Sequence, residues 1–165
     1  MNRSSVTAPA AAFTTVELLI VLALAAGLGA LLTSAYRTFS VRVQVAASID
    51  QTGALRDAVV AAYGRSGEAP AAASPPTLAL QASIASASVS DGRIDIVFGP
   101  DADPALTGRR LPLTPYESAD GQVEWVCGNE IPGLGLQPLG FAAGGRQAVQ
   151  IPATVEPRYL PSRCR

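Results

Sequence analysis

The sequence predicts an α+β protein in which a long amino-terminal helix, able to span a membrane in its first half, packs on an antiparallel sheet of about four strands. Three observations support this fold class. Residues 13–36 are apolar almost throughout, and Glu17 is their only charge. Apolar residues then recur every three or four positions as far as Tyr63, which is typical of a helix. After residue 80, apolar and polar residues alternate between turn-forming sequences, which is typical of strands.

The apolar run is long enough to cross a bilayer. As a helix, residues 18–36 would measure about 28 Å, close to the hydrocarbon thickness of about 30 Å. A carboxylate inside such a helix costs about 2.5–3.5 kcal/mol and normally has a partner. No Lys, Arg or His lies within one turn of Glu17, but cleavage after Ala12 would create an α-amino group at Phe13. We therefore interpret Glu17 as a functional residue rather than an incidental acid of a plain signal anchor.

Two processing sites compete at the amino terminus. Residues 1–12 are small and polar, carry one positive charge at Arg3, and are interpreted as a leader outside the fold. The small residues up to Ala35 also suit a secretory signal peptidase, which would release a soluble periplasmic domain. The acid at the start of the apolar run and the length of that run argue against this second site.

The helical pattern continues beyond the apolar run. It predicts one helix over residues 13–63, about 75 Å long, with residues 13–35 in the membrane and residues 36–64 on a globular head of residues 65–165. Gly53 is a weak point and Gly64 a plausible C-cap, followed by a loop over residues 68–76. The predicted buried stripe consists of Val41, Val45, Ile49, Leu55, Val59 and Tyr63.

The head is predicted to be an antiparallel meander with one apolar face under the helix. The strands are expected near residues 86–90, 93–98, 109–114 and 122–127, with a further short strand at residues 149–151. Asp91-Gly92 and Asp120-Gly121 are turn sequences. Val123, Trp125 and Cys127 should share the apolar face, so Trp125 is interpreted as a core residue rather than a binding aromatic.

The two cysteines, Cys127 and Cys164, lie far from the apolar run. The span implies export, and an even number of cysteines in an exported domain predicts a disulfide rather than a pair of free thiols. The residues between them are rich in Gly and Pro and show little periodicity. We expect this segment to bury little apolar area and to depend on the bridge.

The composition excludes several kinds of chemistry. The chain has no His and only two cysteines, so a His-activated nucleophile and a Cys/His zinc site are both excluded. Asp101 and Asp103 are interpreted as part of a solvated loop, because the sequence lacks the Gly and the distal Glu of a calcium loop. The 12 cationic residues are spread along the chain, which gives no basic patch for nucleic acid. We predict no catalytic residue, no cofactor and no metal site.

The two ends of the chain resemble type IV pilins. The amino-terminal likeness rests on Phe13-Thr14-x-x-Glu17-Leu18, the apolar run, Tyr36 and Arg42-x-Gln44-Val45. The carboxyl-terminal likeness rests on Trp125-x-Cys127 and on Cys164 near the end of the chain.

The resemblance implies a pilin fold and a mechanical function. A prepilin peptidase would cut between Ala12 and Phe13, and Phe13 would be N-methylated. Glu17 would pair with the amino terminus of a neighbouring subunit, and Cys127 and Cys164 would bracket a loop on the filament surface.

The expected protein is a structural subunit of a type IV pilus that serves adhesion, motility or DNA uptake. Its precursor would cross the bacterial inner membrane once, and the assembled pilus would be extracellular. Its partners would be other pilin subunits, the peptidase and the pilus assembly machinery; no sequence feature supports DNA as a partner. The alternatives are a pseudopilin of type II secretion, which often lacks the carboxyl-terminal disulfide, and the soluble domain released after Ala35.

Overall fold

The computed structural model describes residues 14–73 and 80–165. The chain divides into an amino-terminal unit, Met1–Arg37, and a head unit, Thr38–Arg165. Helix α1 (Thr15–Gln51) begins in the first unit and ends in the second. Among the described residues, the stretch Thr15–Ser66 contains the one window that is long and apolar enough to cross a membrane, with a mean hydropathy of 2.3. The helix meets the requirements for crossing a membrane by its length and its composition.

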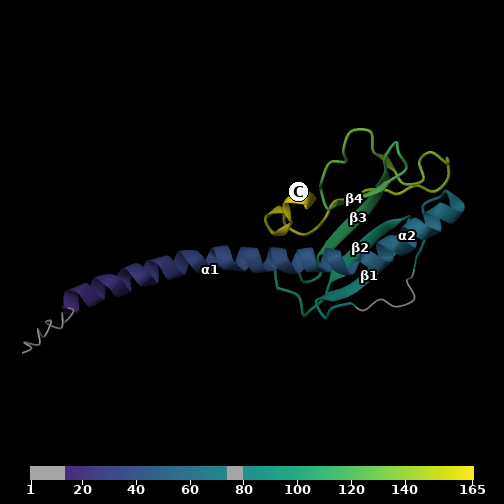
Figure 1. The fold of residues 1–165 in the computed structure, drawn as a ribbon. Helices are drawn as coiled ribbons and strands as arrows, with labels where there is room; N and C mark the ends of the chain where they lie inside the picture. The colour runs from purple at the N-terminus through teal and green to yellow at the C-terminus, as the bar shows by residue number, and fades with distance from the viewer. Residues whose placement is uncertain (1–13, 74–79) are drawn as a thin grey trace, which may run out of the picture. The chain divides into compact units, whose positions relative to one another are not determined.

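The structure corrects the prediction of a single helix over residues 13–63. α1 ends at Gln51, and α2 (Gly53–Ser66) follows after a break at Thr52 (Figure 1). The ψ angle of Thr52 is 5°, far from the value of about −42° in an α-helix. Both its N–H and its hydroxyl donate to the carbonyl of Ile49, at 3.1 and 2.7 Å. The hydroxyl competes with the helical hydrogen-bond ladder, and Gly53 adds a residue of low helix propensity.

Helix α2 ends later than predicted. Gly64 lies inside the helix, and the C-cap is Gly67, with a φ of 71°. Its N–H donates to the carbonyl of Tyr63 at 2.7 Å, which closes a left-handed cap that glycine adopts without steric cost. The prediction of Gly64 as the C-cap is therefore wrong.

The head contains the predicted meander. The strands β1 (Ile84–Ser90), β2 (Arg93–Phe98), β3 (Arg110–Glu117) and β4 (Val123–Cys127) lie in that order and pair antiparallel. The β1–β2 turn has φ angles of 49° at Asp91 and 75° at Gly92, as a type I′ turn requires. β3 extends further than predicted because β4 and β5 (Gln137–Pro138) both pair with its last residues.

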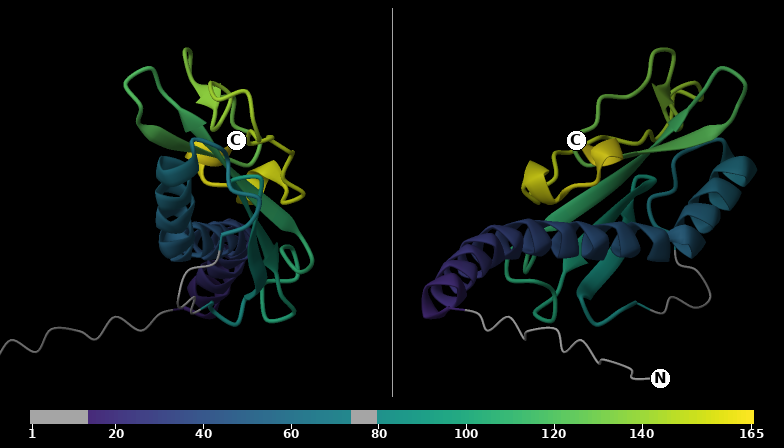
Figure 2. Two further views of the ribbon diagram at one scale, coloured as in Figure 1. Left: turned by 90° about the vertical axis from the view of Figure 1, so that its right-hand side faces the viewer. Right: turned by 60° about the vertical axis from the view of Figure 1, so that its left-hand side comes forward.

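The first face of the sheet carries the core with the helices. Within the head unit, α2 and the end of α1 lie on one side of the strands (Figure 2). Their buried stripe agrees with the prediction: its five aliphatic members are at most 4% exposed, and Tyr63 packs half-buried against the core. The strands contribute buried side chains from alternate positions, namely Ile94, Ile96, Phe98, Leu111, Leu113 and Cys127.

The second face of the sheet is covered by part of the segment of residues 128–165, which contacts it through Val149, Gln150 and Thr154. β3 is buried at every position from Leu111 to Tyr116, which requires cover on both faces. Leu139, Ala148, Val155 and Leu160 from this segment are at most 2% exposed. The expectation that the segment buries little apolar area is therefore wrong.

The short strand predicted at residues 149–151 is absent, and β5 lies at Gln137–Pro138 instead. The backbone around Val149 is bound by side chains rather than by a strand edge, since Arg93 donates to the Val149 carbonyl at 2.8 Å. Val149 is 53% exposed, and so short an apolar stretch does not distinguish a strand from a loop.

Candidate functional sites

Glu17 forms a capping box with Thr14 at the start of α1. The N–H and the hydroxyl of Thr14 donate to Glu17 Oε2, at 3.0 and 3.1 Å, and the N–H of Glu17 donates back to the Thr14 hydroxyl at 3.2 Å. These bonds satisfy donors at the helix start that lack intrahelical partners. Oε1 makes no hydrogen bond to a described residue. Thr14 is thus a local partner that our sequence analysis missed, although Thr-x-x-Glu before an apolar run is a recognisable pattern.

The processing residues Ala12 and Phe13 lie outside the described residues. The described residues of α1 before Arg37 present an apolar surface. The large apolar side chains that the structure describes there are more than half exposed, among them Val16, Leu19, Leu24 and Leu28 at 62–65%. Such a surface requires cover by lipid or by other protein.

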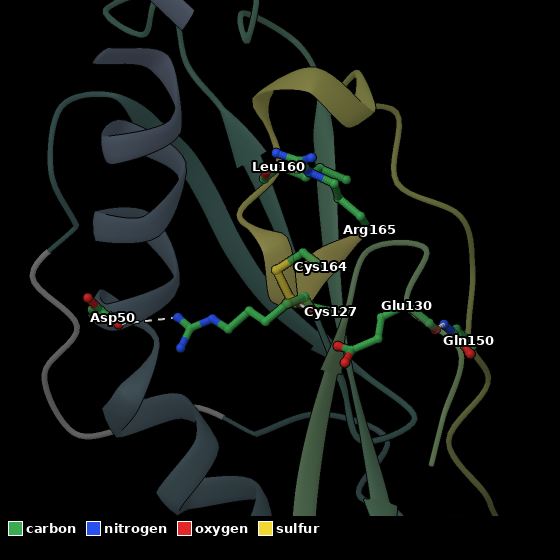
Figure 3. Close-up of a disulfide and its surroundings, with 8 residues drawn as sticks. Asp50, Cys127, Glu130, Gln150, Leu160, Cys164 and Arg165 are labelled. Carbon is green, nitrogen blue, oxygen red and sulfur yellow. Dashed lines mark hydrogen bonds and ion pairs between the residues drawn. A yellow bond between two sulfur atoms is a disulfide. The ribbon is translucent and has the colours of Figure 1, made fainter. Parts of the chain in front are cut away.

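The disulfide joins β4 to the end of the chain (Figure 3). Cys127 is the last residue of β4, and Cys164 lies in the 3₁₀-helix η2 (Ser162–Cys164). Their Cα atoms are 4.8 Å apart, and both residues are buried. Gly128 has a φ of 64°, and a Cβ there would lie 2.7 Å from the carbonyl oxygen of Cys164, so this position needs glycine.

Hydrogen bonds attach the disulfide-closed segment to the second face of the sheet. Tyr116 on β3 donates to the side-chain oxygen of Gln150 at 2.9 Å, and Gln150 donates to the Glu130 carbonyl at 2.8 Å. Two hydrogen bonds join Thr154 to Arg110 at the start of β3. The N–H of Thr154 donates to the carbonyl of Arg110 at 3.0 Å, and the N–H of Arg110 donates to the hydroxyl of Thr154 at 2.7 Å. These partners are far apart in sequence, so no local pattern could have predicted them.

Polar contacts also join the helices to the rest of the head. Arg42 Nε donates to the Arg158 carbonyl at 2.7 Å. Figure 3 shows a guanidinium reaching Asp50 on α1; it belongs to Arg163, at 3.8 Å. The hydroxyl of Tyr63 donates to the Glu117 carboxylate at 2.6 Å, and this bond raises the pKa of Tyr63 above its usual value.

The remaining chemistry-bearing residues occupy structural positions. The described residues contain no group of His, Cys, Asp or Glu that could hold a metal ion. Trp125 is half-buried and packs against the core, on the first face of the sheet with Cys127. Asp103 accepts a hydrogen bond from the N–H of Ala105 at 2.9 Å and so shapes its own loop.

Comparisons with known proteins point to one family. A family model described as Pilin (bacterial filament) matches residues 41–165. A protein of Neisseria gonorrhoeae named Type IV major pilin protein PilE1 is 26% identical over 160 residues, which cover 93% of this chain and 92% of the relative. A second protein of that name and organism is 27% identical over 160 residues, which cover 93% of this chain and 86% of the relative.

Proposed function

Because this chain belongs to the pilin family, we propose that it is a type IV pilus subunit, processed from a membrane-held precursor and polymerised through its amino-terminal helix. Members of this family are structural subunits of filaments rather than enzymes. The observation that carries the proposal is the surface of α1 before Arg37. This surface is exposed and apolar, and Glu17 is its only charge.

The membrane provides the first cover for this surface. We propose that the precursor crosses the bacterial inner membrane once, through residues 13–35, with the head outside the cytoplasm. A prepilin peptidase then cuts between Ala12 and Phe13 and methylates Phe13. The hydropathy of the apolar window and the resemblance of residues 13–18 to the pilin signature support these steps.

Neighbouring subunits provide the second cover. Cleavage would create a cationic amine at Phe13. Glu17 is the one charged side chain of the apolar run. When apolar runs of adjacent subunits pack together, Glu17 of one subunit is therefore the acid that can pair with the amine of its neighbour. The capping box engages Oε2 of Glu17, so Oε1 remains able to accept from the amine of a neighbour. An ion pair inside an apolar bundle is screened little by solvent, which favours pairing over isolated charges.

The heads would then face the outside of an extracellular filament that serves adhesion, motility or DNA uptake. The disulfide-closed segment presents Ile131 and Leu134 to solvent at 88% and 107% exposure, and Phe141 at 54%. The disulfide between Cys127 and Cys164 favours this proposal over a secretion pseudopilus, whose subunits often lack it.

The experiment replaces Glu17 by an isosteric neutral residue in a piliated host that lacks its own major pilin. Gln still supplies a capping oxygen at this position, so Glu17→Gln removes the charge while keeping the cap. We expect the precursor to remain in the membrane and the yield of sheared filaments to fall about tenfold or more, since one ion pair is lost at every subunit contact.

The matched control is Asp50→Asn, which makes the same charge change at an acid on α1 whose side chain is 75% exposed. This variant should assemble like the unchanged chain. Normal filament yield from Glu17→Gln would refute the role of Glu17 in assembly.

A further inference from the structure

Helix α1 is apolar on two opposite faces where it belongs to the head. Val41, Val45 and Ile49 are at most 4% exposed and form one face. Phe39 and Val43 lie on the other face at 64% and 50% exposure. A surface helix normally carries polar residues on its outer face. The outer stripe, defined as Phe39, Val43 and Ala47, is therefore an apolar surface that another molecule can cover.

A groove with acidic residues runs beside this outer stripe. It has a volume of about 480 Å³ and lies between α1 and the loop that follows β2; its walls include Ser40, Val43, Gln44, Ala47, Asp101 and Asp103. The loop is held in place, because the N–H of Asp103 donates to the side-chain oxygen of Gln44 at 3.1 Å. Asp101 is exposed and makes no ion pair with a described residue. The groove thus combines an apolar wall with an unpaired carboxylate.

We propose that the outer stripe and the groove receive helix α1 of a second copy of this chain, with Arg37 of that copy in the groove. This inference rests on the proposed function. Arg37 is the first charge after the apolar run, and it is exposed. Its stem can lie along Val43 and Ala47 while its guanidinium meets Asp101, since arginine pairs with carboxylates through a planar set of donors.

The stagger between two parallel helices supports this pairing. The residues of α1 that line the groove lie within residues 40–47. Arg37 of a second, parallel copy lies beside them when that copy is displaced along the helix axis by 3 to 10 residues, about 5–15 Å. The pairing of Phe13 with Glu17 of a neighbour requires a shift of four residues, about 6 Å, in the same direction. One parallel stacking arrangement therefore satisfies both ion pairs.

A charge exchange in the full-length chain tests the inference. Asp101→Arg and Arg37→Asp each place like charges together, and each should lower the yield of sheared filaments about tenfold. The double variant Arg37→Asp/Asp101→Arg restores opposite charges and should recover most of the yield. Asp57→Arg is the matched control, because Asp57 is an exposed acid on α2 outside the groove, and it should assemble normally.

Cysteines at the same two positions supply a second measurement that does not depend on yield. Oxidation of filaments of Arg37→Cys/Asp101→Cys should produce covalent ladders of subunits, and filaments of either single variant should not. Normal yields from both single charge variants, or filaments that give no ladder, would overturn the inference and leave the proposed function intact. Failure of the unchanged chain to form filaments would instead overturn the proposed function, and the inference with it.

Discussion

Replacing both cysteines by alanine should destabilise the whole head rather than release its last segment alone. The double variant Cys127→Ala/Cys164→Ala avoids leaving a single reactive thiol. The segment that the disulfide closes supplies Leu139, Val155 and Leu160 to the core, all at most 2% exposed. Its departure would expose the second face of β3. We therefore expect the segment and the sheet to unfold in a single transition.

The size of the effect follows from the loop that the bond closes. The cysteines are 37 positions apart. For a loop of this size, the chain-entropy model gives about 4 kcal/mol at 25 °C through restriction of the unfolded chain. A head of this size has about 5–15 kcal/mol of stability in total. Loss of the bond should therefore remove a large share of the free energy of unfolding.

Urea denaturation of a fragment of residues 38–165, which holds the complete head unit, measures this quantity. The oxidised fragment, the reduced fragment and the double alanine variant should be compared by circular dichroism and by Trp125 fluorescence. In the reduced fragment and in the double alanine variant, the free energy of unfolding should be about 4 kcal/mol lower than in the oxidised fragment. The two probes should give the same urea midpoint. A loss below about 1 kcal/mol, or separate transitions for helix and sheet, would refute the reasoning.

Three further predictions concern the same fragment. Ile49→Ala should lower the free energy of unfolding by about 2–5 kcal/mol, because Ile49 is 4% exposed and the substitution would enlarge the cavity of about 80 Å³ that it borders; an unchanged melting temperature would contradict this packing. The hydrogen bond to Glu117 raises the pKa of Tyr63. It therefore stabilises the head fully below pH 10, and this stabilisation is lost as the pH rises through the raised pKa. The free energy of unfolding should therefore fall less steeply above pH 10 in Tyr63→Phe, and identical slopes would refute a native bond to Glu117. Gly128→Ala should destabilise the head more than Gly108→Ala, since both glycines have positive φ but only the first would place its Cβ against backbone; equal losses in urea would argue against that contact.

Much of the head could be predicted because its signals are local. Alternation of apolar and polar residues predicted β2 with the same bounds that the structure has, Arg93–Phe98. Asp91-Gly92 predicted the turn before it. The helical rhythm identified the buried stripe from Val41 to Val59. These patterns depend on residues only a few positions apart, which is where single-sequence reasoning is informative.

The incorrect predictions concern interactions that no local pattern records. The break at Thr52 depends on a hydroxyl that bonds to a backbone carbonyl within the helix. The cover of the second face of the sheet depends on side-chain contacts with β3, such as that between Tyr116 and Gln150. Glycine and proline in that segment suggested an open loop, whereas the fold uses it as a second layer over the sheet.

Intact mass spectrometry of subunits from sheared surface filaments tests the central claim most directly. The claim is that cleavage before Phe13 turns a membrane-held precursor into a filament subunit. It predicts one species that begins at N-methylated Phe13 and retains the disulfide between Cys127 and Cys164. Subunits that begin at Met1 or at Tyr36 would contradict it, because the first would keep the leader and the second would have lost the helix that builds the filament.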